Sequence, residues 1–366
     1  MQDGIYFENA ALLPQGDAVY KKAAEETGAE ALFVSDETYK RYVAGFLTEG
    51  GFAVADRDGT TLFTDARYLE AAEKRLVPLG VKVETLSKEN KPELYLKKYK
   101  SVAVPFSEIS YAEFLTLQQS GAKFSDATNA LRECAKVKTE GELNAISRAC
   151  EIAEEGLTKT LGEIKEGMTE REVAAILEHE MRAFGADGTS FDTIVAFGAG
   201  AAVPHHETGD TRLKFGDEIL IDFGCKTQGY CSDMTRTFLF GDDKNHEDFK
   251  KAYACVLAAH LKVLDELKAG MTGGEGDAIA RNYLEAHGLG KLFTHSLGHG
   301  IGLKIHEFPS LRPGGAEVLT DKMVFSDEPG VYLAGSFGIR IEDTVTMLGG
   351  KAKTFMKKVS KELTVL

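Results

Sequence analysis

Hydrophobic and polar positions follow two different periods along the chain. Up to about residue 125, short apolar runs such as 31–34, 51–55 and 101–105 alternate with amphipathic stretches such as 18–27. Apolar runs of this length predict strands, and the amphipathic stretches predict helices. Further strands are predicted at 61–64 and 81–85, and a helix is predicted over 65–75. The pattern therefore predicts a small N-terminal α/β domain.

The apolar periodicity weakens over residues 125–138, where we predict a linker. A long helix is expected after it, because apolar residues recur at helical spacing, namely Leu143, Ile146, Cys150, Ala153, Leu157 and Leu161. Gly167-Met168 should end this helix, and the capping box Thr-Glu-Arg-Glu at 169–172 should begin another. We therefore predict two domains, residues 1–128 and 129–366.

The second domain repeats its own order of elements. An amphipathic helix over 249–267 is interrupted by Gly-Met-Thr at 270–272, as the earlier helix is by Gly-Met-Thr at 167–169. A helix over 277–286 follows, and each helix pair leads to a predicted hairpin. This order favours a pseudo-twofold domain with its site where the halves join, although chance is an alternative because three-residue matches are weak evidence for a repeat.

Each predicted hairpin carries a pair of acidic residues. Strands at 218–223 and 230–240 form the first hairpin, and symmetry about a turn at 226–228 would place Asp222 opposite Asp233. Like charges opposed across a strand pair repel one another. A divalent cation between the two carboxylates is the simplest explanation for them.

The second hairpin repeats the arrangement with glutamates. Glu328 and Glu342 are equidistant from Gly335, and His299 lies between the two hairpins in sequence, flanked by glycines. Four carboxylates and one imidazole suit two divalent ions, with Mn²⁺ or Co²⁺ favoured over a thiolate-type zinc site. Solvated acids would be the preferred interpretation of either hairpin alone, but the two hairpins together with His299 favour metal.

Composition narrows the class of protein. The 366 residues carry a formal net charge of −14, which argues against nucleic acid or an anionic membrane as a partner. No apolar run reaches the roughly 18 residues of a membrane span, and the N-terminal sequence has no secretory-signal pattern. Five cysteines without metal-knuckle spacing are expected to be reduced thiols in a cytoplasmic protein, with a Cys225–Cys231 redox pair as the alternative.

Several motifs, in this order along the chain, resemble the aminopeptidase P and prolidase family. They are LIDFG at 220–224, GYCSDMTRTF at 229–238, HSLGHGIGL at 295–303, HEFP at 306–309, EPGVY at 328–332 and IRIED at 339–343. The resemblance implies a small creatinase-like α/β domain followed by a pita-bread catalytic domain. It also implies a homodimer, built partly by the N-terminal domain, and a dinuclear metallopeptidase that cuts the bond before proline.

The resemblance implies a role for each metal-ligating residue. Asp222 would bind one ion, Asp233 and Glu342 would bridge both, and His299 and Glu328 would complete the shell of the other. Glu328 would also handle the proton of the attacking water. Two ions roughly 3.5–4 Å apart can lower the pKa of a shared water to about 7, giving hydroxide at neutral pH.

Three more residues are implied to surround this centre. His205 and His306 resemble substrate-contacting histidines, and Arg340 would brace the carboxylate of Glu342. A surface histidine is the alternative for His205, and an ion pair with Glu307 is the alternative for His306. The sequence also departs from the family pattern, most notably at Phe197, Asp327 and Lys304; Asp327 should add negative charge near the metals.

The preferred function is an Xaa-Pro aminopeptidase that acts on peptides with proline in second position. An Xaa-Pro dipeptidase (prolidase) is the first alternative, because Lys304 could hold the carboxylate of a dipeptide if it faced the pocket. A non-proline aminopeptidase, a metal-free relative of the fold and a binding protein with a structural metal are the others. The intact five-residue ligand set argues against a metal-free relative. Structural metal sites are usually closed, whereas this set leaves room for water, which argues against a binding protein.

Overall fold

The computed structural model describes residues 5–8, 10–242 and 246–366. The chain divides into two compact units, one of residues 11–135 and the other of residues 136–366 with the segment before residue 11. Each unit has its own hydrophobic core. No helix in the described part of the chain is long and apolar enough to cross a membrane.

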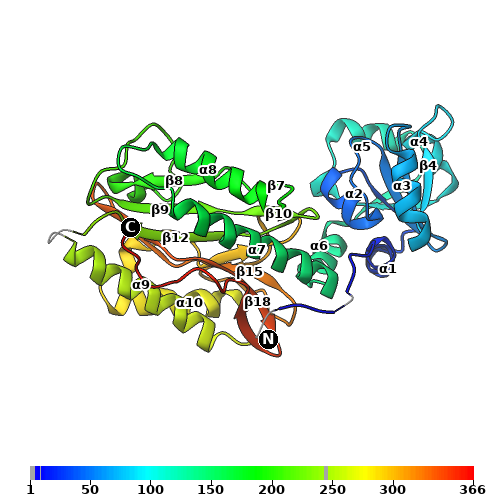
Figure 1. Cartoon of the computed structure of the whole chain (residues 1–366). Coiled ribbons are helices and arrows are strands. Elements are labelled where there is room, and N and C mark those ends of the chain that lie inside the picture. Colours follow the sequence, from blue (N-terminus) through cyan, green and yellow to red (C-terminus); the bar gives the residue numbers. More distant parts are fainter. Residues whose placement is uncertain (1–4, 9, 243–245) are drawn as a thin grey trace. The chain divides into compact units, whose positions relative to one another are not determined.

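The N-terminal unit is a mixed six-stranded sheet with helices around it (Figure 1). The strand order is β4-β3-β2-β1-β5-β6, in which β1, β2 and β3 are antiparallel neighbours and the outer pairings are parallel. The strands are β1 Ala31–Val34, β2 Phe52–Asp56, β3 Gly59–Thr64, β4 Lys82–Thr85, β5 Ser101–Val104 and β6 Lys123–Asp126. The helices are α1 Gly16–Thr27, α2 Glu37–Ala44, α3 Leu69–Leu76, α4 Pro92–Tyr95 and α5 Tyr111–Gln118.

Two predicted boundaries in this region are wrong. Helix α3 begins at Leu69 instead of residue 65, because Asp65 accepts hydrogen bonds from Arg67 in a turn before the helix. The predicted linker at 125–138 contains a further helix, α6 Thr128–Lys136. Ala130, Leu131 and Ala135 of α6 are buried. They lie at helical spacing in the sequence, which was the signal for this helix.

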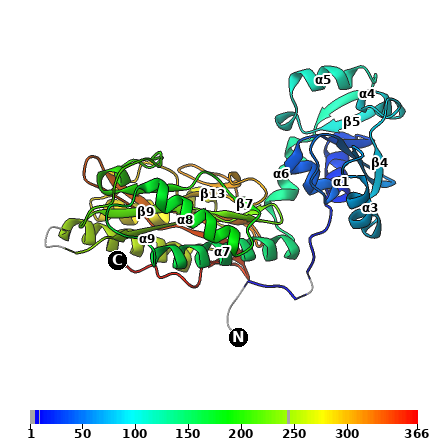
Figure 2. The same cartoon turned by 45° about the horizontal axis from the view of Figure 1, so that its top comes forward.

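The C-terminal unit contains two helix pairs that pack on antiparallel strands (Figures 1 and 2). The helices are α7 Glu140–Leu161, α8 Glu170–Ala183, α9 Glu247–Glu266 and α10 Gly273–Ala286. The strands of the first half are β7 Gly188–Thr189, β8 Ile194–Phe197, β9 Glu218–Phe223, β10 Cys225–Thr227, β11 Tyr230–Cys231 and β12 Met234–Leu239. Those of the second half are β13 Gly298–Gly300, β14 Glu307–Leu311, β15 Val324–Asp327, β16 Gly330–Leu333, β17 Phe337–Arg340, β18 Asp343–Leu348 and β19 Lys351–Thr354.

The second helix of each pair begins in the same way. Thr169 caps α8 and Thr272 caps α10, and in each case a glutamate three residues later completes a capping box. The capping box at Thr169 confirms the sequence prediction. Helix α10 begins at Gly273, four residues before the predicted start, because the cap offsets the poor helix propensity of Gly273 and Gly274.

The first hairpin does not have the predicted register. Asp222 on β9 lies opposite Thr235 on β12, so Asp222 and Asp233 are not directly opposed. The predicted strand 230–240 is divided, because β10 and β11 turn away to pair in a separate sheet with β7. Asp233 lies in the gap between β11 and β12, where its backbone N–H and carbonyl both bond the hydroxyl of Thr344.

The second hairpin has the predicted register. Gly330 pairs with Arg340, and Asp327 pairs with Asp343. The two residues of each pair are equidistant from Gly335, and the two pairs flank the glutamates. Gly335 has a φ of 74°, a left-handed conformation that glycine adopts without strain. Glu328 and Glu342 therefore lie at the same level of the hairpin.

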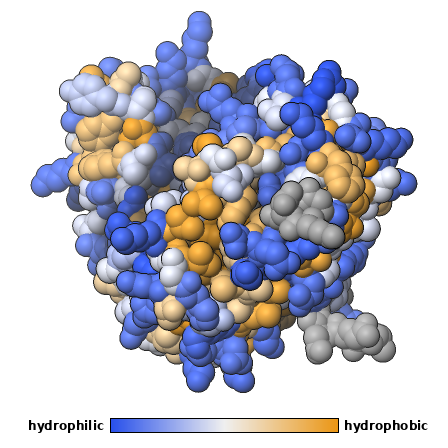
Figure 3. Space-filling model, turned by 90° about the vertical axis from the view of Figure 1, so that its left-hand side faces the viewer, coloured by the Kyte–Doolittle hydropathy of each residue, from blue (hydrophilic) through white to orange (hydrophobic). Residues whose placement is uncertain are grey.

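The surface mixes polar and apolar residues. Figure 3 shows one face on which hydrophobic residues gather toward the centre and hydrophilic residues surround them.

The five cysteines are free thiols, of which Cys150, Cys225 and Cys231 are buried. Burial raises the pKa of Cys225 to about 12 and that of Cys231 to about 11, as expected for unreactive thiols.

Candidate metal centre

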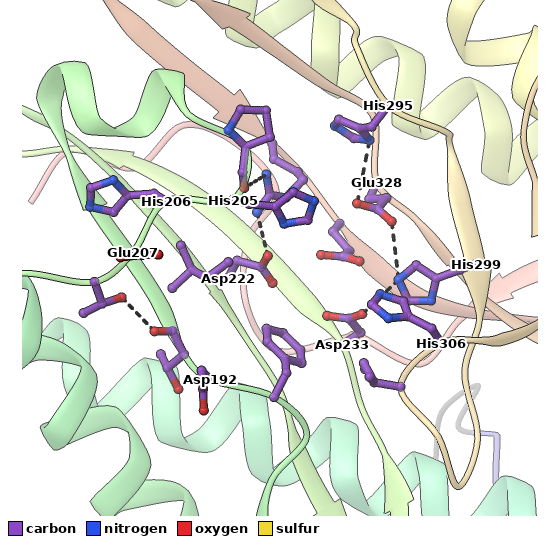
Figure 4. A pocket seen from close by; sticks show the side chains of 18 of the residues that line it. Asp192, His205, His206, Glu207, Asp222, Asp233, His295, His299, His306 and Glu328 are labelled. Atoms are coloured by element: carbon purple, nitrogen blue, oxygen red, sulfur yellow. Dashed lines mark hydrogen bonds and ion pairs between the residues drawn. The ribbon is translucent and has the colours of Figure 1, made fainter. Parts of the chain in front are cut away.

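All eight predicted site residues line one pocket of about 790 Å³ in the C-terminal unit (Figure 4). They come from four separate parts of that unit: the loop after β8, the first hairpin, the segment from β13 to β14, and the second hairpin. The residues are His205, Asp222, Asp233, His299, His306, Glu328, Arg340 and Glu342. The fold thus joins residues that lie up to 137 positions apart, since 342 − 205 = 137.

The centre of the pocket is a group of buried carboxylates. Asp233 is 4% exposed and Glu342 is 2% exposed. Burial raises the pKa of Asp233 well above its usual value, and the neighbouring carboxylates of Glu342 and Asp222 raise it further. Burial and the carboxylates of Glu328 and Asp222 do the same to the pKa of Glu342. Crowded acids of this kind are stabilised when cations lie between them.

Arg340 is the one arginine among the described residues that line the pocket, and it binds Asp222 instead of Glu342. Its Nη2 lies 2.6 Å from Oδ2 of Asp222, while Nη1 donates to the hydroxyl of Tyr332 at 2.6 Å. The prediction that Arg340 braces the carboxylate of Glu342 directly is therefore corrected. The other oxygen of Asp222, Oδ1, is buried and has no hydrogen-bond partner, so it is available to a metal ion.

Thr235 connects the two hairpins through its hydroxyl. Nε of Arg340 donates to Oγ1 of Thr235 at 3.0 Å, and Oγ1 donates to Oε2 of Glu342 at 2.6 Å. The backbone N–H of Glu342 also donates to the carbonyl of Thr235 at 3.1 Å. Sequence reasoning gave Thr235 no role, although it lies two residues after Asp233 within a motif that was recognised.

His299 supplies the imidazole of the centre. Its Nε2 lies 3.5 Å from Oδ2 of Asp233 and 3.5 Å from Oε1 of Glu328. Nδ1 faces the carbonyl of Gly300 at 3.1 Å, which leaves Nε2 for the carboxylates. Burial, reinforced by His306, lowers the pKa of His299 to about 4, so the imidazole is neutral at pH 7 and able to bind a metal ion.

The two oxygens of the Glu328 carboxylate have different neighbours. Its Oε1 accepts a hydrogen bond from Ser326 at 3.0 Å, and Oε2 lies 3.9 Å from Nδ1 of His295. Burial raises the pKa of Glu328 to about 8, despite the opposing effect of Arg340. A carboxyl group with a pKa near neutrality is suited to accept and release a proton.

His295 is a pocket residue that sequence reasoning did not select. Its Nε2 lies 3.0 Å from the hydroxyl of Tyr332, which also bonds Arg340. Burial, reinforced by Arg340, lowers the pKa of His295 to about 4. The position of His295 in the motif HSLGHG, four residues before His299, was the available signal.

His205 lies on a loop that a buried acid holds at both ends. Glu170 on α8 accepts hydrogen bonds from the N–H of Phe197 at 3.1 Å and of Gly209 at 2.8 Å. The same carboxylate lies 3.0 Å from Nε2 of His206, and both His206 and its neighbour His205 line the pocket. His306 reaches the pocket from the other side, where its ring lies 4.2 Å from that of His299.

Asp327 adds negative charge near the centre without lining the pocket, because its charge contributes to the raised pKa of Glu328. Its carboxylate is fully buried and lies 3.0 Å from Nδ1 of His260 on α9. Asp327 is not among the residues that line the pocket, whereas the next residue, Glu328, is. Successive side chains of an extended chain alternate in direction, which explains the difference.

The donor set fits divalent metal ions. Asp233, His299 and Glu342 each offer one atom, and these three atoms all lie within 4.8 Å of one another. Asp222 and Glu328 line the same pocket. Oxygen-rich sets with one imidazole suit Mn²⁺ and similar ions. The cations would also relieve the repulsion that raises the pKa values of the buried acids.

The fold and this centre define a class of protein that comparison confirms. Residues 144–348 match the model of metallopeptidase family M24, and residues 20–135 match the creatinase/prolidase N-terminal domain. The chain belongs to metallopeptidase family M24. It is therefore a hydrolase, and its C-terminal unit has the pita-bread fold.

Individual relatives cover nearly the whole chain. It is 34% identical over 342 residues to an Xaa-Pro dipeptidase from Pyrococcus horikoshii, covering 93% of this chain and 95% of the relative. A solved X-Pro aminopeptidase from Thermotoga maritima matches with a TM-score of 0.88 at 32% identity, covering 94% and 100%. A solved Xaa-Pro dipeptidase from Bacillus anthracis matches with a TM-score of 0.90 at 32% identity, covering 96% and 99%.

Proposed function

We propose that the protein hydrolyses the peptide bond between an N-terminal residue and a following proline. The observation that carries this proposal is the five-donor cluster at the centre of the pocket, in a chain of family M24. Asp222, Asp233, His299, Glu328 and Glu342 would hold the divalent ions. Mn²⁺ is the ion that we propose, with Co²⁺ or Zn²⁺ as substitutes.

The ions, when bound, activate a water molecule and polarise the scissile carbonyl. The protein's own residues then have separate tasks. Glu328 accepts the proton of the attacking water at Oε2, the oxygen that Ser326 does not occupy. His205 and His306 donate to carbonyl groups of the substrate from opposite sides of the pocket. Arg340 contributes indirectly, because it fixes the carboxylate of Asp222.

Proline in second position has to be recognised by shape. Proline has no N–H to donate and a fixed φ, so its ring needs an apolar surface instead of a hydrogen-bond acceptor. Phe191, Ile194 and Ile305 line the pocket together with the polar residues of the centre. These side chains offer the apolar contact that a pyrrolidine ring requires.

An aminopeptidase preference follows from the cations of the pocket. A dipeptide places the proline carboxylate inside the pocket, and such a carboxylate needs a cationic partner. Lys304 is not among the described residues that line the pocket, and Arg340 already pairs with Asp222. Longer peptides carry an amide at that position and do not need the cation.

The second candidate function is an Xaa-Pro dipeptidase. It is favoured by the similarity to Xaa-Pro dipeptidases, including the one from Pyrococcus horikoshii at 34% identity. A pocket histidine such as His205 or His306 would then donate a hydrogen bond to the proline carboxylate. This candidate shares the metal centre and the cleaved bond, and differs only in the length of the substrate.

A substrate panel tests both candidates. We expect Mn²⁺-loaded protein to cleave Ala-Pro-Ala with a higher kcat/KM than Ala-Pro, and we expect Lys304→Ala to leave this ratio unchanged. A strong preference for Ala-Pro would establish the dipeptidase, and loss of that preference in Lys304→Ala would show that Lys304 binds the carboxylate. Turnover of Met-Ala peptides without turnover of either proline peptide would contradict proline specificity.

A further inference from the structure

A buried ion pair lies directly behind one wall of the pocket. Nζ of Lys138 lies 2.5 Å from Oε1 of Glu307, and the two side chains are 1% and 9% exposed. Lys138 follows helix α6 by two residues, and Glu307 is the first residue of β14. Glu307 also follows His306 directly, so the pair joins the segment after α6 to the residue next to a proposed substrate contact.

The carboxylate of Glu307 fills the loop that leads to His306. It accepts a hydrogen bond from the backbone N–H of Lys304, and it packs so closely against Gly302 that an added Cβ there would lie 2.4 Å from Oε1. The loop also closes on itself, because the N–H of Gly302 donates to the carbonyl of Lys304 at 3.1 Å. The carboxylate of Glu307 therefore helps to set the path of residues 302–306, together with the hydrogen bond from the N–H of Cys231 to the carbonyl of Gly302 at 2.8 Å.

His306 has little else to hold it. Within the described part of the chain its side chain packs against the ring of His299 at 4.2 Å but makes no hydrogen bond. His306 is exposed at the pocket, whereas the residue that follows it is anchored. The direction of the imidazole is consequently set by the backbone of the loop.

We propose that Lys138 and Glu307 are positioning residues, which hold the loop so that the imidazole of His306 stays directed at the substrate. This inference rests on the proposed function, in which His306 donates to the substrate. Burial raises the pKa of Glu307, and Lys138 opposes that rise. Without Lys138, the carboxyl group either takes up a proton or moves toward water, and the loop loses its anchor in both cases.

The chain offers a matched control for Lys138. Lys136 lies two residues earlier, and its Nζ is also 2.5 Å from a glutamate oxygen, Oε1 of Glu317. Glu317 does not line the pocket, and the Lys136 pair is more exposed, with side chains 13% and 23% accessible. A general effect of losing a lysine from this segment should appear in both variants.

The test is a double-mutant cycle on kcat/KM for Ala-Pro-Ala, with Lys138→Met, His306→Ala and the two combined. We expect His306→Ala to cost about 100-fold, the scale of one general acid or oxyanion contact. Lys138→Met should cost about 10-fold in the wild-type background and less than about 2-fold in His306→Ala, because residues that act through one another are not additive. Lys136→Met should leave kcat/KM unchanged in both the wild-type and the His306→Ala background.

Two outcomes would overturn the inference. One is an equal loss from Lys138→Met with and without His306, which would show a general structural effect. The other is a folded Lys138→Met protein with full activity. If Lys138→Met does not fold, Glu307→Gln replaces it in the same cycle, because it keeps the shape of the side chain and removes its charge.

A second readout separates this inference from the proposed function. If wild-type protein cleaves no Xaa-Pro peptide, the proposed function fails, and the position of His306 is then followed by the NMR signal of its C2 proton. The signal should shift in Lys138→Met and stay unchanged in Lys136→Met. An unchanged signal in Lys138→Met would overturn the positioning role whatever the activity.

Discussion

A single hydroxyl group links the two acid pairs of the metal centre. Oγ1 of Thr235 receives a hydrogen bond from Arg340 and donates one to Glu342, and Arg340 in turn holds Asp222. The carboxylates of two different hairpins are thus oriented by one chain of side chains. Replacing groups that orient metal ligands typically lowers metal affinity or activity by about 10- to 100-fold.

Replacing Thr235 by valine should therefore weaken metal binding. Valine keeps the shape of threonine but removes the hydroxyl, so Glu342 loses a donor and Nε of Arg340 loses an acceptor. We expect Mn²⁺ affinity, measured by calorimetric titration, to fall about 10- to 100-fold, the usual range for such orienting groups. Thr346→Val is the control, because Thr346 is equally buried and its Oγ1 donates to Met323, away from the pocket. Equal affinities for the two variants would contradict the role of Thr235.

At the scale of elements, strands β15 and β18 lie next to Glu328 and Glu342 in sequence and carry a buried charge cluster of their own. Asp327 and Asp343 are directly paired across these strands and are fully buried. His260 on α9 lies between them, with Nδ1 3.0 Å from Asp327 and Nε2 3.5 Å from Asp343. Arg236 and Lys361 also pair with Asp343, at 2.8 Å and 2.9 Å.

The charge of His260 should make the free energy of unfolding depend on pH between about 6.5 and about 9. Burial lowers its pKa, but Asp327 and Asp343 outweigh burial and raise the pKa to about 9. A raised folded-state pKa means that the stabilisation is fully present below the unfolded value of about 6.5 and is lost as pH rises through about 9. The rise of the pKa from about 6.5 to about 9 corresponds to at most roughly 3.4 kcal/mol of unfolding free energy.

The measurement compares wild type with the double variant His260→Leu/Asp327→Val. Urea unfolding between pH 6.5 and pH 9.5, with chelator present to remove metal, should show the free energy of wild type falling relative to the variant. His260→Leu alone should be less stable than the double variant, because it leaves the buried carboxylate of Asp327 unpaired. A stability difference that does not change with pH would contradict the charged state of His260.

At the scale of the whole molecule, metal should be part of the stability of the C-terminal unit. An ion that binds only the folded state stabilises it by about 2.7 kcal/mol when present at 100 times its Kd. We expect two Mn²⁺ per chain after dialysis, and a rise in the unfolding temperature when Mn²⁺ is restored to chelator-treated protein. Asp233→Asn should fold but lose most of this rise. A metal content of one ion or fewer, or an unfolding temperature that Mn²⁺ does not change, would contradict the dinuclear centre.

The two units also carry predictions that concern assembly. The expected homodimer, built partly by the N-terminal domain, and the cytoplasmic location stay predictions. The division of the chain into an N-terminal domain of residues 1–128 and a catalytic domain of residues 129–366 also stays a prediction. The family assignment applies to the whole chain, because relatives match more than nine-tenths of it.

The sequence by itself determined the elements and the chemistry of the site. Apolar periodicity located the long helices α7 to α10 but missed shorter ones such as α2, α5 and α6. The capping box at Thr169 located the start of α8, because this signal acts within a few residues. The register of the second hairpin followed from its symmetry about Gly335, since a short turn leaves few ways to pair its strands. The family motifs then identified the acids and His299 before any distance was known.

Only the tertiary structure decided which side chains meet. The first hairpin opens into a second sheet after Gly224, so Asp222 faces Thr235, and symmetry alone could not reveal this. Arg340 and Asp222 are 118 positions apart, and Lys138 and Glu307 are 169 apart. Local periodicity carries no information on partners at such separations, because these contacts are set by how the hairpins and helices pack. The residue types of the site were therefore predictable from the sequence, whereas the contacts between their side chains were determined by the tertiary structure.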